Sequence, residues 1–163
     1  MSLLYIIFDN FSIEIIIKVC DNMKEFISDS EKRTMQIAEE ICADIKGGSV
    51  VAFFGGMGMG KTAFVRGALK AYSNDSFVSS PTFALVHDYG GNPTIYHFDM
   101  YRVSSLDDLY STGYFDYLSD DSILFIEWSE NIESALPENV IKIYFSLGNE
   151  ENIRIIRVEG GQF

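Results

Sequence analysis

The chain has 163 residues, of which 47% are hydrophobic and 14% aromatic, and this composition predicts one globular domain and excludes an intrinsically disordered protein. Twelve Lys and Arg residues against 24 Asp and Glu residues give a net charge of −12. Such an acidic surface repels the phosphate backbone of nucleic acids, so direct nucleic-acid binding is not expected, and any role in RNA biology would pass through a partner protein.

The cysteines and histidines give no sign of a disulfide framework or of a metal site. Cys20 and Cys42 form no C-x-x-C pair, and His87 and His97 lack metal-ligand spacing with them. We expect both cysteines to be buried, as suits a reducing cytoplasm. No stretch reaches the roughly 18 apolar residues of a transmembrane helix, and the apolar amino terminus lacks the basic start of a signal peptide. A cytoplasmic protein without membrane association is therefore expected.

Residues 1–22 are expected to be an N-terminal extension to a single domain that spans 23–163. An apolar run at 4–8 is followed by the turn-forming pair Asp9-Asn10 and by alternating apolar and polar residues at 12–19. This pattern predicts a pair of strands. Such a pair would add to the edge of a sheet or meet a partner protein.

A helix is predicted to open the domain. Ser28-Asp29-Ser30-Glu31 fits a capping box, which predicts a helix from there to about Lys46, ended by Gly47-Gly48. Residues that recur at helical spacing would form its buried face, namely Met35, Ala38, Ile41, Cys42 and Ile45.

A phosphate-binding loop is predicted at Gly55–Thr62, whose sequence fits the pattern G-x-x-x-x-G-K-[ST]. Glycines let the backbone bend and turn successive N–H groups toward a phosphate. Lys61 would neutralise the β- and γ-phosphates, and the Thr62 hydroxyl would bind Mg²⁺. The apolar run 49–54 and the helical pattern over 63–72 supply the strand and helix that this motif requires. We therefore predict that the chain binds a nucleoside triphosphate.

Several residues of the loop and of the start of the next helix are expected to contact the nucleotide. They are Gly56, Gly58, Gly60, Lys61, Thr62 and Ala63.

Two β-hairpins are predicted beyond the phosphate loop. The strand-like runs 82–89 and 94–98 are separated by a Gly-Gly-Asn-Pro loop, and the runs 140–147 and 153–158 flank Gly148-Asn149.

One buried strand and two short helices complete the predicted elements. The strand covers 122–126, Ser104 would cap a helix that ends by Gly113, and a second short helix would cover 129–136. Together the elements predict an α/β P-loop NTPase fold: a mixed, mostly parallel central sheet flanked by helices, with β-hairpin additions.

Two acids that directly follow apolar strands are candidates for the chemistry. Asp99 follows the run 95–98 and Glu127 follows 123–126, so both would lie at the carboxyl edge of the sheet, where ligands bind. The alternative for either acid is a solvated strand end or a helix cap.

Three further residues near these acids are ambiguous. Thr82 lies in a Ser-Pro-Thr loop of the kind that senses a γ-phosphate, but an ordinary proline turn has the same residues. Trp128, the only tryptophan, would stack on a ligand or fill the core. His97 is expected to be a hydrogen-bonded structural histidine.

The separated motifs resemble the TsaE (YjeE) family of bacterial P-loop ATPases over about residues 26–158. In chain order they are Thr34, Gly55–Thr62, Phe64–Gly67, Ser80–Phe83, His97–Arg102, Ile126–Trp128 and Pro137. The resemblance implies an ATPase that supports the TsaD–TsaB enzyme pair. That pair installs threonylcarbamoyl on the adenosine beside the anticodon of tRNAs that read ANN codons.

The resemblance also implies roles for individual residues. Lys61 and Thr62 would serve the phosphates and Mg²⁺, Asp99 would help hold the metal, and Glu127 would be the catalytic acid beside it. The family usually has an acidic residue where this chain has Gly56, so a loop contact made by that acid would be missing here.

Two other functions remain open from the sequence. A small-molecule kinase would need a lid with several arginines, and no arginine-rich segment is visible. A nucleotide-dependent binding module with little turnover is the second alternative. Arg102 is the best candidate for an arginine finger within the chain, so we expect slow hydrolysis alone and faster hydrolysis with a partner.

Overall fold

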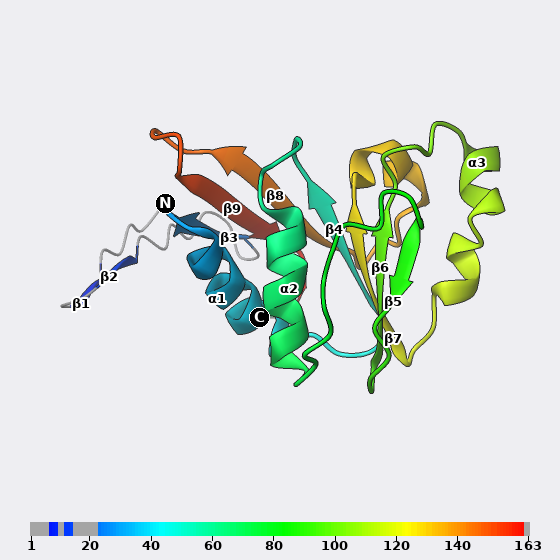
Figure 1. Cartoon of the computed structure of the whole chain (residues 1–163), viewed down its shortest axis with the longest axis horizontal. Coiled ribbons are helices and arrows are strands. Elements are labelled where there is room, and N and C mark those ends of the chain that lie inside the picture. The colour runs from blue at the N-terminus through cyan, green and yellow to red at the C-terminus, as the bar shows by residue number, and fades with distance from the viewer. Residues whose placement is uncertain (1–6, 10–11, 15–22, 162–163) are drawn as a thin grey trace.

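The computed structural model describes residues 7–9, 12–14 and 23–161 and has one seven-stranded sheet as its centre (Figure 1). The strands lie in the order β3-β9-β8-β4-β7-β6-β5. Their bounds are β3 Met23–Ser28, β4 Ser49–Phe54, β5 Val86–Asp88, β6 Thr94–Asp99, β7 Ser122–Glu127, β8 Ile141–Leu147 and β9 Arg154–Glu159. The helices are α1 Glu31–Cys42, α2 Lys61–Ala71 and α3 Leu106–Ser111, with 3₁₀ turns η1 Tyr114–Tyr117 and η2 Ser129–Ala135.

The four central strands are parallel and the outer strands are antiparallel. β8, β4, β7 and β6 pair in parallel, whereas β5, β9 and β3 each pair antiparallel with a neighbour. All six residues of β7 are buried, as expected for a parallel strand covered on both faces. The predicted P-loop NTPase fold, with a mixed sheet, flanking helices and hairpin additions, is confirmed.

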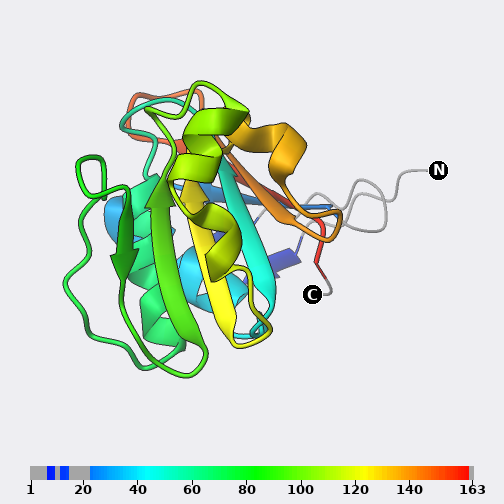
Figure 2. The same cartoon turned by 90° about the vertical axis from the view of Figure 1, so that its right-hand side faces the viewer.

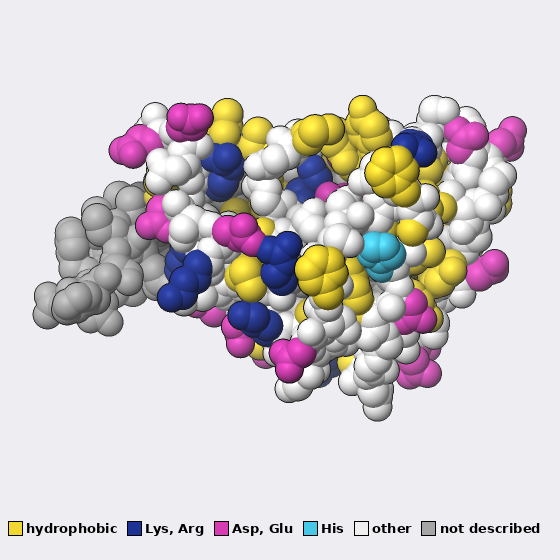
Figure 3. All heavy atoms as spheres, viewed as in Figure 1, with side chains coloured by type: hydrophobic (Ala, Val, Ile, Leu, Met, Phe, Trp, Pro, Cys, Tyr) yellow, Lys and Arg dark blue, Asp and Glu magenta, His cyan; other side chains and the backbone are white. Residues whose placement is uncertain are grey.

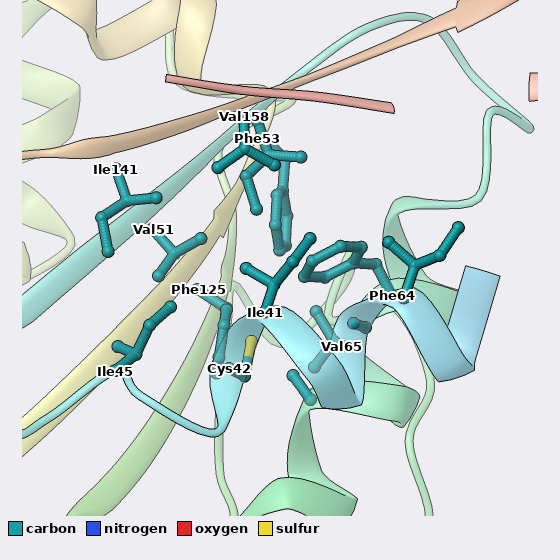
Figure 4. Packing of buried hydrophobic residues seen from close by; sticks show 14 of the residues in the cluster. Ile41, Cys42, Ile45, Val51, Phe53, Phe64, Val65, Phe125, Ile141 and Val158 are labelled. Atoms are coloured by element: carbon teal, nitrogen blue, oxygen red, sulfur yellow. The ribbon is translucent and has the colours of Figure 1, made fainter. Parts of the chain in front are cut away.

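Helices α1 and α2 cover one face of the sheet, and their core is built around Phe53. Its ring contacts the rings of Phe64 from α2, Phe125 from β7 and Phe145 from β8 at centroid distances of 5.3 to 6.0 Å (Figure 4). Gly67 lets the two helices approach, because a Cβ there would lie 2.2 Å from the Met35 carbonyl oxygen.

The other face of the sheet is covered by α3, η1 and η2. Figure 2 brings α3 and η1 to the front of the sheet. Phe98 from β6 packs its ring edge-on against Tyr114 and Tyr117 from η1, at 5.9 and 5.2 Å. β4, β6 and β7 contribute buried residues to both cores, so close packing on both faces positions the carboxyl ends of these strands.

The first helix begins and ends at different residues from those predicted. Ser30, not Ser28, is the N-cap, and its hydroxyl accepts a hydrogen bond from the Arg33 amide at 3.2 Å. Ser28 instead ends β3, a strand that was not predicted, and its buried hydroxyl lies 2.7 Å from that of Thr34. The helix ends at Cys42 instead of about Lys46.

Two other boundaries also differ. The strand predicted from 82 covers only β5, because the chain turns at 82–84 and the Leu85 amide donates to the Pro81 carbonyl at 2.7 Å. Ser105 caps α3, whereas the Ser104 hydroxyl donates to the carboxylate of Asp108 at 2.7 Å.

Most of the predicted N-terminal extension lies outside the described residues. Within it, β1 (Ile7–Asp9) and β2 (Ser12–Glu14) pair antiparallel with each other and not with the seven-stranded sheet. The division into an extension and a domain stays a prediction. Among the described residues, no helix is long and apolar enough to cross a membrane.

Candidate nucleotide-binding site

The loop between β4 and α2 wraps around the ammonium group of Lys61. Gly60, with φ 102°, is the N-cap of α2, and Gly58 has φ 73°, so both take up the left-handed conformation that favours glycine. Lys61 Nζ donates to the carbonyl oxygens of Gly55 and Gly56 at 2.6 and 2.7 Å. The lysine therefore lies under the loop, within reach of any anion that the loop amides would bind.

The Lys61 ammonium also lies over the ring of Trp128, 4.5 Å from its centroid. Burial lowers the pKa of Lys61, while the nearby charges of Glu127, Glu130 and Asp99 act in the opposite direction. Burial outweighs the three carboxylates, so the pKa of Lys61 lies below its usual value.

Thr62 and Glu127 meet at the edge of the sheet. The Thr62 hydroxyl donates to Glu127 Oε1 at 2.7 Å, and His97 Nε2 lies 3.0 Å from the same oxygen. His97 is completely buried, and the hydroxyl of Tyr89 lies 3.4 Å from its Nδ1. Burial, followed by the charge of Glu127, raises the pKa of Tyr89 to about 12, so this hydroxyl stays protonated. Thr62 and His97 together therefore hold Oε1 of Glu127 in place.

Asp99 ties the loop at residues 80–82 to the same edge. Its Oδ2 accepts hydrogen bonds from the hydroxyls of Ser80 at 2.8 Å and Thr82 at 2.7 Å, and its Oδ1 accepts one from the Tyr101 amide at 3.0 Å. Asp99 is aligned with Glu127 in the parallel register of β6 and β7, so the two carboxylates lie side by side.

These groups surround one pocket of about 450 Å³, above the ends of β4, β6 and β7. The sequence-predicted residues that line it are Gly58, Gly60, Lys61, Thr62, Ala63, Thr82, Asp99, Glu127 and Trp128. Gly56 does not line the pocket and contributes only its carbonyl oxygen to Lys61. That these residues bind a nucleotide stays a prediction.

The donor set fits a magnesium nucleotide. Side-chain oxygens of Thr62, Asp99 and Glu127 are the hard ligands that Mg²⁺ prefers, and Mg²⁺ commonly binds through one or two carboxylates plus substrate phosphates. Among the described residues, no group of three or more His, Cys, Asp or Glu side chains could hold a metal by itself. A metal here would therefore be shared with phosphate oxygens.

Two residues at this site are not evident as functional from the sequence pattern. The pattern predicts only a structural role for His97, which lies two residues before Asp99 and so faces the same side of β6. No motif points to Arg66, which lines the pocket and donates a hydrogen bond to Glu31 from α1. Arg102, the predicted arginine finger, does not line the pocket. Its guanidinium lies over the ring of Phe83, 5.0 Å from the centroid.

Comparisons with known proteins agree with this architecture. The family model described as "Threonylcarbamoyl adenosine biosynthesis protein TsaE" matches residues 28–156. A protein of Aquifex aeolicus named "tRNA threonylcarbamoyladenosine biosynthesis protein TsaE" is 36% identical over 138 residues, which are 83% of this chain and 97% of that protein. A protein of Treponema pallidum with the same name is 37% identical over 107 residues, 64% of this chain and 79% of that protein.

A solved structure is similar over most of the chain. The crystal structure of YdiB from Bacillus subtilis superposes with a TM-score of 0.69 at 25% sequence identity, covering 88% of this chain and 90% of that one. The family match covers well over half of the chain and includes the phosphate loop and both strand-end acids. The chain therefore belongs to the TsaE family.

Proposed function

We propose that the protein binds ATP with Mg²⁺ in this pocket and hydrolyses it in support of tRNA threonylcarbamoyladenosine modification, together with a TsaD–TsaB type complex. The observation that carries the ATPase proposal is that Lys61, Thr62 and two strand-end carboxylates meet in one pocket. The role in tRNA modification is supported by family membership and by the names of the relatives.

The phosphate end of the nucleotide would be held by the loop and the start of α2. Lys61 would exchange the carbonyl oxygens of Gly55 and Gly56 for oxygens of the β- and γ-phosphates. The Thr62 hydroxyl donates a hydrogen bond to Glu127, which leaves the lone pairs of the hydroxyl oxygen available to Mg²⁺. Bound Mg²⁺ would neutralise charge on the phosphate oxygens.

Glu127 is the proposed catalytic acid, oriented for a water molecule beside the γ-phosphate. His97 would keep the Glu127 carboxylate in place from the buried side, through the contact between its Nε2 and Glu127 Oε1. Asp99 holds the hydroxyls of Ser80 and Thr82, so a direct contact between Asp99 and Mg²⁺ would require these hydroxyls to turn away. We propose that this exchange lets the loop at 80–82 sense the nucleotide.

Hydrolysis is proposed to be slow for the protein alone. The pocket has Arg66, but Glu31 and the Val78 carbonyl hold its guanidinium, and Arg102 packs on Phe83. Both arginines are thus engaged with other groups of the chain, and a partner would complete the site.

A protein partner also fits the surface around the pocket. Met57 and Phe83 are 75% and 90% exposed beside it, and Figure 3 shows hydrophobic side chains along the upper edge of the molecule. On the face in Figure 3, acidic side chains stand among the basic ones, so contact with tRNA is proposed to be indirect. The proposed location is the cytoplasm.

Phosphate release from ATP tests the proposal. It should be measured for the full chain alone, with the TsaD–TsaB pair, and with candidate small-molecule acceptors. Slow release alone and faster release with the pair are expected. Formation of ADP and a phosphorylated acceptor without release of phosphate would favour the kinase. Tight ATP binding with neither product under any condition would favour the binding module.

A further inference from the structure

The contact between Arg102 and Phe83 joins two segments at the rim of the pocket. β5 pairs antiparallel with β6, so the loop that enters β5 meets the chain that leaves β6 (Figure 1). Phe83 directly follows Thr82, which lines the pocket. Arg102 likewise follows Tyr101, which also lines it. The guanidinium of Arg102 therefore lies beside the proposed ATP site without being part of its lining.

The loop that carries Phe83 is held in one shape by Asp99. The carboxylate of Asp99 accepts from the hydroxyls of Ser80 and Thr82, and its amide donates to the Leu85 carbonyl at 3.0 Å. Leu85 has φ 69°, a conformation that bulky residues rarely adopt, and strain of this kind concentrates at functional sites. The Phe83 side chain is nevertheless 90% exposed. A fixed loop thus presents a large aromatic ring to the solvent, as the anchor residues of protein interfaces are presented.

Of the two arginines near the pocket, Arg102 is the more weakly held. Arg66 forms an ion pair with Glu31 and also donates to the Val78 carbonyl. Among the described residues no carboxylate pairs with Arg102, which lies over the ring of Phe83 at 5.0 Å. A cation over an exposed ring is favoured only about two- to fivefold over the separated groups. A protein that buried the Phe83 ring would take away the surface on which this guanidinium lies.

We propose that Arg102 is a catalytic residue that contacts the γ-phosphate only after a partner protein has covered Phe83. This inference rests on the proposed function and names the group that the partner brings into the site. Phosphoryl transfer to water spreads negative charge over the γ-phosphate oxygens, and an arginine placed there stabilises that charge. Arg102 forms and breaks no covalent bond.

The partner acts on Arg102 in two ways. It removes the ring that holds the guanidinium, and it closes the rim of the pocket, so that the freed guanidinium turns to the phosphates instead of the solvent. The partner therefore needs an apolar hollow for Phe83 and needs no arginine of its own at the phosphates. In the chain alone, Lys61 and Mg²⁺ hold the nucleotide, so ATP binds and is hydrolysed slowly.

Phosphate release at increasing concentrations of the TsaD–TsaB pair separates catalysis from docking. Arg102→Ala should lower the maximal rate with the pair about tenfold or more and leave the half-saturating concentration of the pair unchanged. Arg157→Ala is the matched control, because the Arg157 guanidinium also lies over a ring, that of Tyr144 at 5.9 Å, but does not line the pocket. It should keep the full maximal rate. A full maximal rate in Arg102→Ala, whatever its half-saturating concentration, would overturn the catalytic role.

Phe83→Ala frees Arg102 without a partner. The hydrolysis rate of the full chain alone should rise about two- to fivefold, the factor by which the ring holds the guanidinium back. This rise should disappear in the double variant Phe83→Ala/Arg102→Ala. Phe77→Ala removes another phenylalanine that is 88% exposed in the same loop, and it should leave the rate unchanged. No rise in Phe83→Ala would overturn the restraint of Arg102 by Phe83.

Failure of this inference differs from failure of the proposed function. If the pair stimulated the unaltered protein and Arg102→Ala to the same maximal rate, only the role of Arg102 would be lost. If the pair stimulated neither protein and ADP did not bind, the proposed function would fail, and this inference with it.

Discussion

The Thr62 hydroxyl and the Glu127 carboxylate are 65 residues apart in the chain and joined by a 2.7 Å hydrogen bond. The bond links the first turn of α2 to the end of β7, and so connects the phosphate loop to the proposed catalytic acid. Both groups lie where a metal held by phosphates would meet the protein. Their pairing explains why the loop and this acid are expected to act as one unit.

Glu127→Gln should stop ATP turnover and leave nucleotide binding nearly intact. Glutamine keeps the shape and can still accept from Thr62, but it cannot take a proton or carry the charge. We expect a loss of about 10²–10⁴ in the hydrolysis rate, the range for general acid–base groups. Phosphate release and the Kd for ADP measure the two effects. Full turnover in this variant would make Asp99 the leading acid.

Lys61→Ala should weaken nucleotide binding. Loss of charge-assisted hydrogen bonds to phosphate oxygens is expected to raise the Kd for ADP about 10- to 100-fold. Lys70→Ala removes an exposed lysine from the same helix and serves as the control. Equal affinities in both variants and the unaltered protein, measured by calorimetry, would place the phosphates elsewhere.

His97→Leu should reduce turnover without changing nucleotide affinity, because His97 lies 3.0 Å from Glu127 Oε1 but does not line the pocket. A decrease of about tenfold in kcat corresponds to roughly 1.4 kcal/mol of lost positioning. His97→Gln can still donate to Glu127 and should recover part of the rate. A purely structural role would lower the unfolding temperature of both variants and show no difference in kcat between them.

Gly67→Ala should destabilise the fold, because a methyl group there would meet the backbone of Met35 at 2.2 to 2.7 Å. Backbone atoms cannot move aside as a side chain can, so α1 and α2 would have to separate. We expect a loss of about 1–3 kcal/mol in the free energy of unfolding by urea. Lys70→Ala on the exposed face of α2 should stay within about 0.5 kcal/mol of the unaltered protein.

The buried thiol of Cys42 should make the protein less stable at alkaline pH. Burial raises the pKa of Cys42 well above its ordinary value of 9.0. Above pH 9.0 the thiol of the unfolded chain loses its proton, while the buried thiol of the folded chain keeps it. The free energy of unfolding therefore falls as pH rises. From pH 8 to 9.5 the expected loss is about 0.8 kcal/mol.

Cys42→Ala isolates this contribution, although it also leaves a small cavity. Its unfolding free energy should depend less on pH over the same interval than that of the unaltered protein, whatever its absolute value. Parallel pH profiles for the two proteins would show that Cys42 is not the titrating group.

The phosphate loop, both acids and the sheet class were predictable because local patterns specify them. The motif fixes the loop, and apolar runs that end in an acid fix Asp99 and Glu127. The prediction of Ser28 as the N-cap of α1 was wrong, because Ser28 and Ser30 are both good capping residues. Only the pairing of β3 with β9, which includes Ser28, decides between them. The contact of His97 with Glu127 depends on the register of β6 and β7, which no local pattern shows.

A structure of the full chain with MgADP or an ATP mimic tests the central claim most directly. We predict that the β-phosphate lies against the amides of residues 55–62 near Lys61, with the metal at the hydroxyl of Thr62. A nucleotide found away from this loop, or no bound nucleotide at saturating concentration, would contradict the account.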